Sequence, residues 1–409
     1  MSDRVILHCD CNSFFASVET ALNPAYKNVP MAVCGSESDR HGIVLAKNEL
    51  AKKYGIQTAE TVYSAKKKCP NLVIASPHYD EYVKYSKRVN EIYARYTDMI
   101  EPFGIDESWL DVSASKKLFG TGLEIAEKIR LAVKEEIGIT VSIGVSFNKV
   151  FAKLGSDYKK PDAITVINRE DMARIVYPLP VSDLLFVGKK TEGQLNMMGV
   201  RTIGDLARVS REVLVARFGK VGEQLYKNAH GLDDSPVARV GEYEDQKSIG
   251  FGFTFRHDLI TREECKIAIN YLSDDVARRL RKSQMVCNTV QLSIKDEHLA
   301  VIQRQRTLPH PSDIAHDISA LAYKILEDEW SESRPIRMLT VTAQNLTRSE
   351  FSSEQIDMFG MQDEARREKD KKEEETVDKI RQKFGGLSIT NGAILTTDIG
   401  IKNRKSKQE

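Results

Sequence analysis

The sequence predicts an α+β protein of several domains, with a ferredoxin-like sheet in the first of them. Three observations lead to this prediction. Apolar, β-rich runs alternate with segments of helical spacing from residue 5 to residue 167, and one pair of strands is adjacent in the middle. This order is typical of a split βαβ unit. Residues 168–231 show helical patterns, and a second alternation of strands and helices follows at 247–345.

The elements of the first domain follow from the period of their apolar residues. Alternation and β-branched residues predict strands at 5–9, 100–105, 109–112, 139–145 and 163–167. Spacings of three and four predict helices through Phe14–Leu22, 80–97, Ile125–Val133 and 147–158. Asn12 or Ser13 can cap the first of these helices. Between the first two helices, residues 23–77 are rich in turns and lysine.

The rest of the chain is predicted in the same way. The helical segment holds two glycine-containing turns, Val187–Lys190 and Gly219–Gly222, each of which opens a helix. Residues 232–245, with five acids and one arginine, indicate a linker. After it we expect strands at 248–255, 289–294 and 338–343, and helices at 263–282 and 312–330. The chain is polar from 346, and its mixed-charge run at 366–383 predicts either a salt-bridged helix or a solvated tether.

Composition limits the class of protein. Because 60 Lys and Arg nearly balance 59 Asp and Glu, the net charge of +1 argues against a polybasic coat for nucleic acid. No apolar run approaches the ~18–20 residues that a membrane helix needs. We therefore expect no membrane segment. Six scattered cysteines without zinc spacing indicate reduced thiols and hence a cytoplasmic protein.

Three carboxylates are the sharpest chemical feature: Asp10 at the end of a strand, and Asp106 and Glu107 at the joint between two others. Successive strand residues point to opposite faces, so Asp106 and Glu107 share one site only if the chain turns or bulges there. Such oxygen ligands suit Mg²⁺, and two ions about 4 Å apart can activate a 3′-hydroxyl and stabilise a leaving pyrophosphate. The pattern alone leaves a metal site and capped surface acids equally open.

Longer motifs around these acids carry a family resemblance. They are DCNSFFASVE at 10–19, GIDESWLD at 104–111, GVSFNKVFAKL at 144–154, SDYKKP at 156–161 and KSIG at 247–250. As a set they resemble the motifs of the Y-family DNA polymerases, in the branch of bacterial DNA polymerase IV, over residues 3–345. The resemblance implies a palm (1–22 and 78–165), fingers (23–77), a thumb (166–231), a linker (232–245) and a little-finger domain (246–345).

The resemblance also implies roles for residues of the active site. Asp10 and Asp106 would hold both Mg²⁺ ions, Glu107 would complete the site that activates the primer hydroxyl, and the Cys11 carbonyl would touch the nucleotide-side ion. Many relatives carry a second Asp where this chain has Asn12, so Asn12 is not counted as a ligand.

The nucleotide site is expected beside these acids. Phe15, next to Phe14, matches the steric gate that rejects a ribose 2′-oxygen, although its spacing alone favours an ordinary core aromatic. Lys160 matches the lysine that meets the triphosphate. Glu49 and Lys52 stand where relatives often have Tyr and Arg. Lys52 keeps a point charge, whereas Glu49 cannot donate a hydrogen bond as tyrosine does.

Contacts to DNA are expected in the thumb and the little finger. The two thumb turns resemble helix–hairpin–helix elements, whose amides bind phosphates without reading sequence. Their candidate residues are Gly188, Gly219 and Gly222, and Phe186 stands where a glycine is usual, which predicts a weaker first turn. In the little finger, the basic positions along the template are matched by Arg304, Arg306 and Arg337.

A short peptide in the tail resembles the segment by which bacterial polymerases dock on the β sliding clamp. It consists of Gln355, Ile356, Asp357, Met358 and Phe359. The whole tail, 346–409, is expected to be flexible and to carry this peptide.

Taken together, the sequence predicts a DNA-templated DNA polymerase for translesion synthesis, of low fidelity and without proofreading. It would act as a monomer on primer–template DNA and dNTPs, with two Mg²⁺ ions. The alternative is a catalytically silent scaffold of the same fold that binds DNA and the clamp. The presence of Asp10, Asp106 and Glu107 argues against that scaffold. A palm-type nucleotidyl cyclase would have no use for a thumb, a little finger and a clamp peptide.

Overall fold

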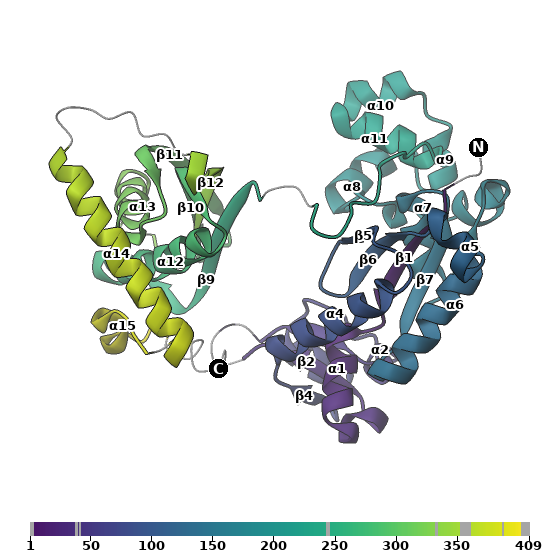
Figure 1. Ribbon diagram of the computed structural model, residues 1–409, viewed down its shortest axis with the longest axis horizontal. Helices are drawn as coiled ribbons and strands as arrows, with labels where there is room; N and C mark the ends of the chain where they lie inside the picture. The colour runs from purple at the N-terminus through teal and green to yellow at the C-terminus, as the bar shows by residue number, and fades with distance from the viewer. Residues whose placement is uncertain are drawn as a thin grey trace. The chain divides into compact units, whose positions relative to one another are not determined.

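The structure, a computed structural model, describes residues 4–36, 40, 42–242, 246–331, 334–351, 361–386 and 388–401. The chain divides into two compact units (Figure 1). The first consists of Met1–Gly35 and Ile43–Tyr243, and the second of Ser36–Gly42 and Glu244–Glu409. Among the described residues, no helix combines the length and the apolar character that crossing a membrane requires.

A five-stranded sheet in the order β5-β6-β1-β7-β8 forms the centre of the first unit. Its strands are β5 (Ile100–Pro102), β6 (Glu107–Asp111), β1 (Ile6–Cys11), β7 (Val141–Ser146) and β8 (Ile164–Ile167). Only β8 pairs in parallel, with β7, and the other neighbours in the sheet are antiparallel. The order β7-β1-β6-β5 is that of a split βαβ unit, so the predicted ferredoxin-like sheet is confirmed.

Different helices cover the two faces of this sheet. The helices of the region are α1 (Phe14–Leu22), α4 (Tyr79–Tyr93), α5 (Lys116–Phe119), α6 (Gly122–Ala132) and α7 (Lys149–Tyr158). The odd-numbered residues of β1 join the core under α4 and α6, whereas His8 points to α7, where it is hydrogen-bonded to Ser156. Gly144 allows α7 to lie this close, because a Cβ there would stand 1.8 Å from the Ala152 carbonyl oxygen.

Residues 23–77 hold a second, smaller sheet. It has the order β3-β2-β4, from β3 (Val44–Lys47), β2 (Met31–Cys34) and β4 (Val73–Ala75), with the helices α2 (Glu49–Lys52) and α3 (Val62–Lys68). These strands of three or four residues are too short to give a clear alternation in sequence, which is why only turns and lysines were evident there.

The helical segment that follows is confirmed. Its helices are α8 (Lys189–Met197), α9 (Ile203–Ala207), α10 (Arg211–Phe218) and α11 (Lys220–Ala229). Their apolar side chains share one core with Phe147 and Phe151. Side-chain caps start two of these helices: Thr202 and Asp205 form a capping box before α9, and Ser210 caps α10.

Much of the predicted linker is packed on the first unit. The Arg4 guanidinium donates hydrogen bonds to the carbonyls of Asp233, Asp234 and Ser235. Val237 is buried in a small cluster with Trp109 of β6. Residues 233–238 of the predicted linker are therefore held on the first unit, through backbone carbonyls that no sequence pattern reveals.

The second unit is built on a four-stranded antiparallel sheet in the order β11-β10-β12-β9. Its strands are β9 (Ser248–Leu259), β10 (Met285–Asp296), β11 (Val301–Ser312) and β12 (Ile336–Arg348), and its helices are α12 (Arg262–Lys282) and α13 (Ala315–Glu329). The sequence did not predict β11, because this edge strand is mostly polar and includes Pro309 and Pro311, residues that an edge strand tolerates.

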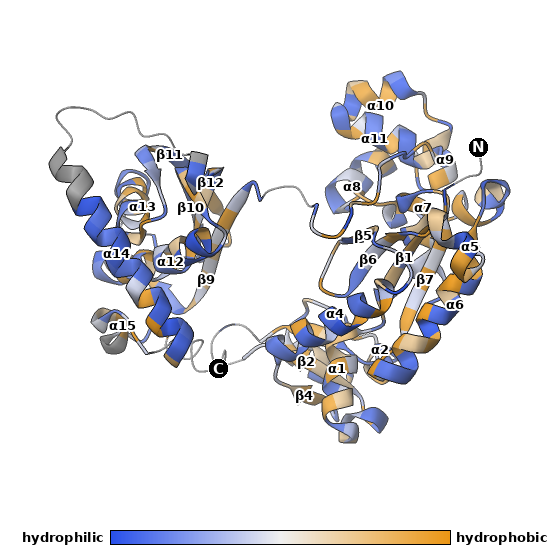
Figure 2. Cartoon of the chain, viewed as in Figure 1, coloured by the Kyte–Doolittle hydropathy of each residue, from blue (hydrophilic) through white to orange (hydrophobic). Residues whose placement is uncertain are grey.

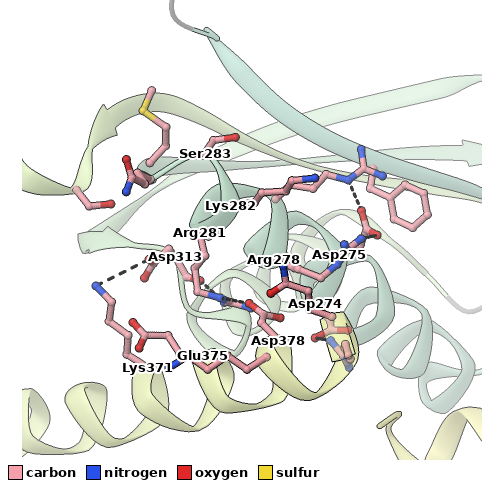
Figure 3. A pocket seen from close by; sticks show the side chains of 18 of the residues that line it. Asp274, Asp275, Arg278, Arg281, Lys282, Ser283, Asp313, Lys371, Glu375 and Asp378 are labelled. Atoms are coloured by element: carbon pink, nitrogen blue, oxygen red, sulfur yellow. Dashed lines mark hydrogen bonds and ion pairs between the residues drawn. The ribbon is translucent and has the colours of Figure 1, made fainter. Parts of the chain in front are cut away.

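The tail folds onto this unit, so the predicted flexibility is wrong for its described residues. Its helices are α14 (Met361–Phe384), which is hydrophilic along most of its described length (Figure 2), and α15 (Gly392–Thr396). Arg281 of α12 points at α14, where its Nε lies 2.7 Å from Asp378 (Figure 3). The Arg281 guanidinium also pairs with Glu374. Ile394, Ile399 and Ile401 are buried in the core of the second unit.

Candidate active site

The three predicted acids lie at one end of the central strands. Asp10 stands near the end of β1, directly opposite Glu107, the first residue of β6. Residues opposite each other in antiparallel strands share a face, so both side chains lie on the face that α7 covers. Asp106 precedes β6, and its carbonyl accepts a hydrogen bond from the Cys11 N–H at 2.9 Å. The hairpin therefore turns at 103–106, and Glu107 belongs to the strand rather than to the joint.

Glu107 is held by two residues that sequence reasoning did not single out. Lys153 Nζ lies 2.5 Å from Glu107 Oε2, and His8 Nε2 lies 3.3 Å from the same oxygen. Burial disfavours the charged carboxylate, but the neighbouring His8 ring and Lys153 ammonium group outweigh it and lower the pKa of Glu107 to about 2. Side chains alternate between the two faces of β1, which places His8 on the same face as Asp10. This alternation was the one feature of the sequence that could have indicated a role for His8.

The other two carboxyls, Asp10 and Asp106, have raised rather than lowered pKa values. Burial raises the pKa of Asp10, although Lys160 Nζ, 2.6 Å from its Oδ2, opposes the shift. Burial, together with the negative charges of Asp10 and Glu107, raises the pKa of Asp106 to about 6. A positive charge that all three acids could share would relieve this repulsion.

A divalent cation fits the chemistry of this donor set. Its oxygens are hard ligands of the kind that Mg²⁺ prefers, and the negative charges of Asp10 and Glu107 around Asp106 outweigh the opposing charge of Lys160. Among the described residues, no group of three His, Cys, Asp or Glu side chains is close enough to hold a metal. Lys160 pairs with Asp10, and Lys153 pairs with Glu107. The Cys11 thiol is buried, on the other face of the sheet from Asp10.

The two phenylalanines after Asp10 have different surroundings. Phe14 is buried in the main core, whereas Phe15 is half-buried and stacks on Tyr82 of α4, with ring centroids 4.2 Å apart and planes 12° apart. The Tyr82 hydroxyl donates a hydrogen bond of 2.5 Å to Glu19, a buried acid that also meets His78 at 2.9 Å. Tyr82 and Glu19 thus fix the ring of Phe15, and sequence reasoning missed both of them.

Glu49 and Lys52 lie together on α2. Lys52 Nζ is 2.6 Å from Glu49 Oε1, and Ser13 Oγ donates a hydrogen bond to the same oxygen at 3.1 Å. Ser13 precedes α1 and follows the Asp10 strand. The pair therefore lies beside the start of α1, and Glu49 offsets the positive charge of Lys52.

The glycines of the two predicted thumb turns have different structural roles. Gly219 has a left-handed backbone with φ of 60°, as a tight turn before α11 requires. Gly222 lies where α10 and α11 touch, because a Cβ there would stand 2.0 Å from the Leu214 carbonyl oxygen. Gly188 has an extended backbone, and a Cβ at this position would have no other atom within 4 Å.

The predicted arginines of the second unit have acidic partners. Arg304 and Arg306 of β11 lie opposite Leu292 and Val290, two buried residues on the face that α12 and α13 cover. Arg304 Nε is 3.2 Å from Glu329, and Arg306 pairs with Asp328, both near the end of α13. These two side chains therefore lie on the face of the sheet that carries α12 and α13 rather than on the opposite face. Arg337 lies in β12 and is half-buried. The predicted clamp peptide, 355–359, lies outside the described residues.

Comparison with known proteins places these features in a family. A model of the impB/mucB/samB family matches residues 9–157, its C-terminal domain model matches 246–358, and a thumb domain model of DNA polymerase iota matches 182–233. The chain is 48% identical to the DNA polymerase IV of Acetivibrio thermocellus over 398 residues, which is 97% of this chain and 99% of the relative. The chain belongs to the Y family of DNA polymerases.

Further relatives agree with this membership. The DNA polymerase IV of Moorella thermoacetica is 39% identical over 396 residues, which is 97% of each chain. A solved Y-family DNA polymerase chimera superposes with a TM-score of 0.74 at 24% identity, over 83% of this chain and 98% of its own, which supports the fold. The predicted family, the predicted fold class and the predicted enzyme class, a DNA-directed DNA polymerase, are confirmed. A general dependence on divalent metal follows from the family.

Proposed function

We propose that this polymerase carries out translesion synthesis, extending a primer 3′-hydroxyl with dNTPs on a DNA template and without proofreading. The observation that carries the proposal is the opposition of Asp10 and Glu107 on neighbouring strands, with Asp106 beside them. All three acids would hold two Mg²⁺ ions, with the Cys11 carbonyl as a further ligand. When bound, such ions supply activation of the hydroxyl and stabilisation of the leaving pyrophosphate.

We propose distinct tasks for the residues around these acids. His8 and Lys153 keep Glu107 ionised and oriented. Lys160 meets the triphosphate, and Lys52 adds positive charge there once its ion pair with Glu49 opens. Phe15 excludes a ribose 2′-oxygen, and its stacking on Tyr82 supports a fixed position for the ring.

The domain roles are part of the same proposal. Residues 1–22 and 78–165 would be the palm, 23–77 the fingers, 166–231 the thumb and 246–345 the little finger. The proposed fingers contain strands of only three or four residues and helices of four and seven residues. Such a small subdomain encloses little of a nascent base pair, which favours bypass of damaged templates at low fidelity.

The proposed partners are primer–template DNA and the β sliding clamp. The thumb turns at Gly188 and at Gly219–Gly222 would contact duplex phosphates, and Arg304, Arg306 and Arg337 the template strand. Because Arg304 and Arg306 are paired with acids, their contact would require those ion pairs to open. Gln355–Phe359 would bind the clamp. We place the enzyme in the cytoplasm, since its six cysteines are all described and buried and none forms a disulfide. We further propose that it acts as a monomer.

Primer extension with Asp106→Ala tests the proposal. We expect this variant to lose Mg²⁺-dependent extension while its affinity for primer–template DNA stays within about twofold of the parent. Asp80→Ala, which removes an exposed acid of α4, is the matched control and should extend normally. Extension by Asp106→Ala would disprove the metal assignment. Extension that stops at every damaged template base would disprove translesion synthesis.

A further inference from the structure

Phe186 has an unusual backbone in the turn before α8. Its φ is 72°, in the left-handed region, and its side chain is 62% exposed. The residues around it are fixed, because Leu184 and Val187 are buried and the Val187 N–H donates a hydrogen bond of 3.0 Å to the Leu184 carbonyl. The surrounding turn thus dictates the conformation that Phe186 adopts.

The fold itself gains no packing stabilisation from a phenylalanine at this position. A bulky side chain in the left-handed region is strained, and glycine is not. The same helical segment uses glycine at its other left-handed positions, Gly199, Gly219 and Gly231. Within the part of the chain that the structure describes, no ring contact or cation–π contact involves Phe186, and it is not in the buried cluster of this segment. Strain held at an exposed residue is typical of a functional site.

The surroundings of Phe186 suit the backbone of a nucleic-acid duplex. Lys189 and Lys190 are exposed in the first turn of α8, where unpaired backbone N–H groups also favour phosphate. Asp183 and Glu192 flank the same turn and offset the lysine charges. Charge alone therefore gives this turn little affinity, and an apolar ring adds a contact that salt does not screen.

We propose that Phe186 packs against the deoxyribose edge of duplex primer–template DNA, in the minor groove, while the amides after it approach the phosphates. Apolar side chains are well suited to this groove. The inference rests on the proposed function only in taking primer–template DNA as the ligand. It reverses the sequence expectation, because Phe186 strengthens the first thumb turn rather than weakening it.

Binding of a fluorescent primer–template duplex to Phe186→Gly tests this inference, without dNTP or Mg²⁺. Glycine removes both the ring and the strain, so the melting temperature should stay or rise. Affinity should fall about fivefold to tenfold, as expected for uncovering roughly half of a phenylalanine ring. Phe186→Tyr keeps the ring and should bind like the parent.

The salt dependence separates this contact from the charged ones. The slope of log Kd against log salt should be unchanged in Phe186→Gly, whereas replacing both Lys189 and Lys190 with alanine should reduce it. Unchanged affinity of Phe186→Gly, or a loss that accompanies a lower melting temperature, overturns the inference. If the parent chain itself fails to bind the duplex, the proposed function fails, and the inference fails with it.

Discussion

The amino group of Lys160 lies 2.6 Å from Oδ2 of Asp10 and 2.8 Å from Oδ1 of Asp157. The lysine thus bridges the strand that carries the first acid and the helix α7 that precedes the lysine. A cation bound by Asp10 would compete with this ammonium group and release it toward a nearby phosphate. One residue would then serve both the acid and the triphosphate.

Replacing Lys160 with methionine should expose this double role. We expect the KM for dNTP to rise about tenfold to a hundredfold, the usual value of a lost charge-assisted hydrogen bond. Binding of Mn²⁺, followed by its electron paramagnetic resonance signal, should be as tight as in the parent or tighter, because a competing cation is gone. Lys160→Arg keeps the charge and should keep most of the dNTP affinity. An unchanged KM in Lys160→Met would contradict the phosphate role.

Substitution of Phe15 by alanine should admit ribonucleotides. The preference for dNTP over rNTP, measured as the ratio of kcat/KM values, should fall by about 10- to 200-fold, the range for one steric contact in a pocket. Tyr82→Phe is the matched control, since it removes only the hydroxyl that meets Glu19 and keeps the stacked ring. The gate assignment fails if Phe15→Ala discriminates as well as the parent.

The clamp peptide is tested by alanine at both Met358 and Phe359. This change should abolish stimulation of primer extension by the β clamp, because two apolar anchors are lost, and it should spare synthesis without the clamp. Alanine at both Ser352 and Ser353, in the same polar segment, should leave stimulation intact. Equal stimulation of all three proteins would refute the docking peptide.

The helices and strands in which apolar residues recur at a regular spacing could be predicted from sequence. The strand before Asp10 and the helices around Tyr82 and Ile125 are examples, because their buried faces recur at fixed spacing. The polar edge strand β11 gave no such signal. The mixed-charge run of α14 left a salt-bridged helix and a solvated tether open, because its partner Arg281 lies about a hundred residues earlier in the chain.

The partners of the site residues were beyond sequence reasoning for the same reason. Lys153 reaches Glu107 across 46 residues, and Tyr82 reaches Glu19 across 63. Likewise, the register that turns Arg304 toward the helices depends on pairing between strands, and a shift of one residue would have reversed it.

The docking of α14 on the second unit should depend on pH through Glu374. Its Oε1 accepts a hydrogen bond of 2.8 Å from the Ala315 N–H at the start of α13, and its other oxygen pairs with Arg281, which is 9% exposed. Burial raises the pKa of Glu374 to about 7, although Arg281 opposes the shift. Asp274, Asp313 and Asp378 also act on this cluster, so the effect of Glu374 must be isolated by substitution.

The direction of this pH dependence follows from proton linkage. A carboxyl whose pKa is near 7 when folded and about 4.3 when unfolded binds its proton more tightly in the folded state. Its contribution to stability is therefore complete below about pH 4.3 and is lost as the pH rises through 7. Across this range the free energy of opening α14, measured by hydrogen–deuterium exchange of its amides, should fall on the order of 1–3 kcal/mol. Glu374→Gln should remove that part of the pH dependence. Glu373→Gln, at a side chain that is 64% exposed, should retain it, and equal pH profiles for the two variants would exclude Glu374 as the titrating group.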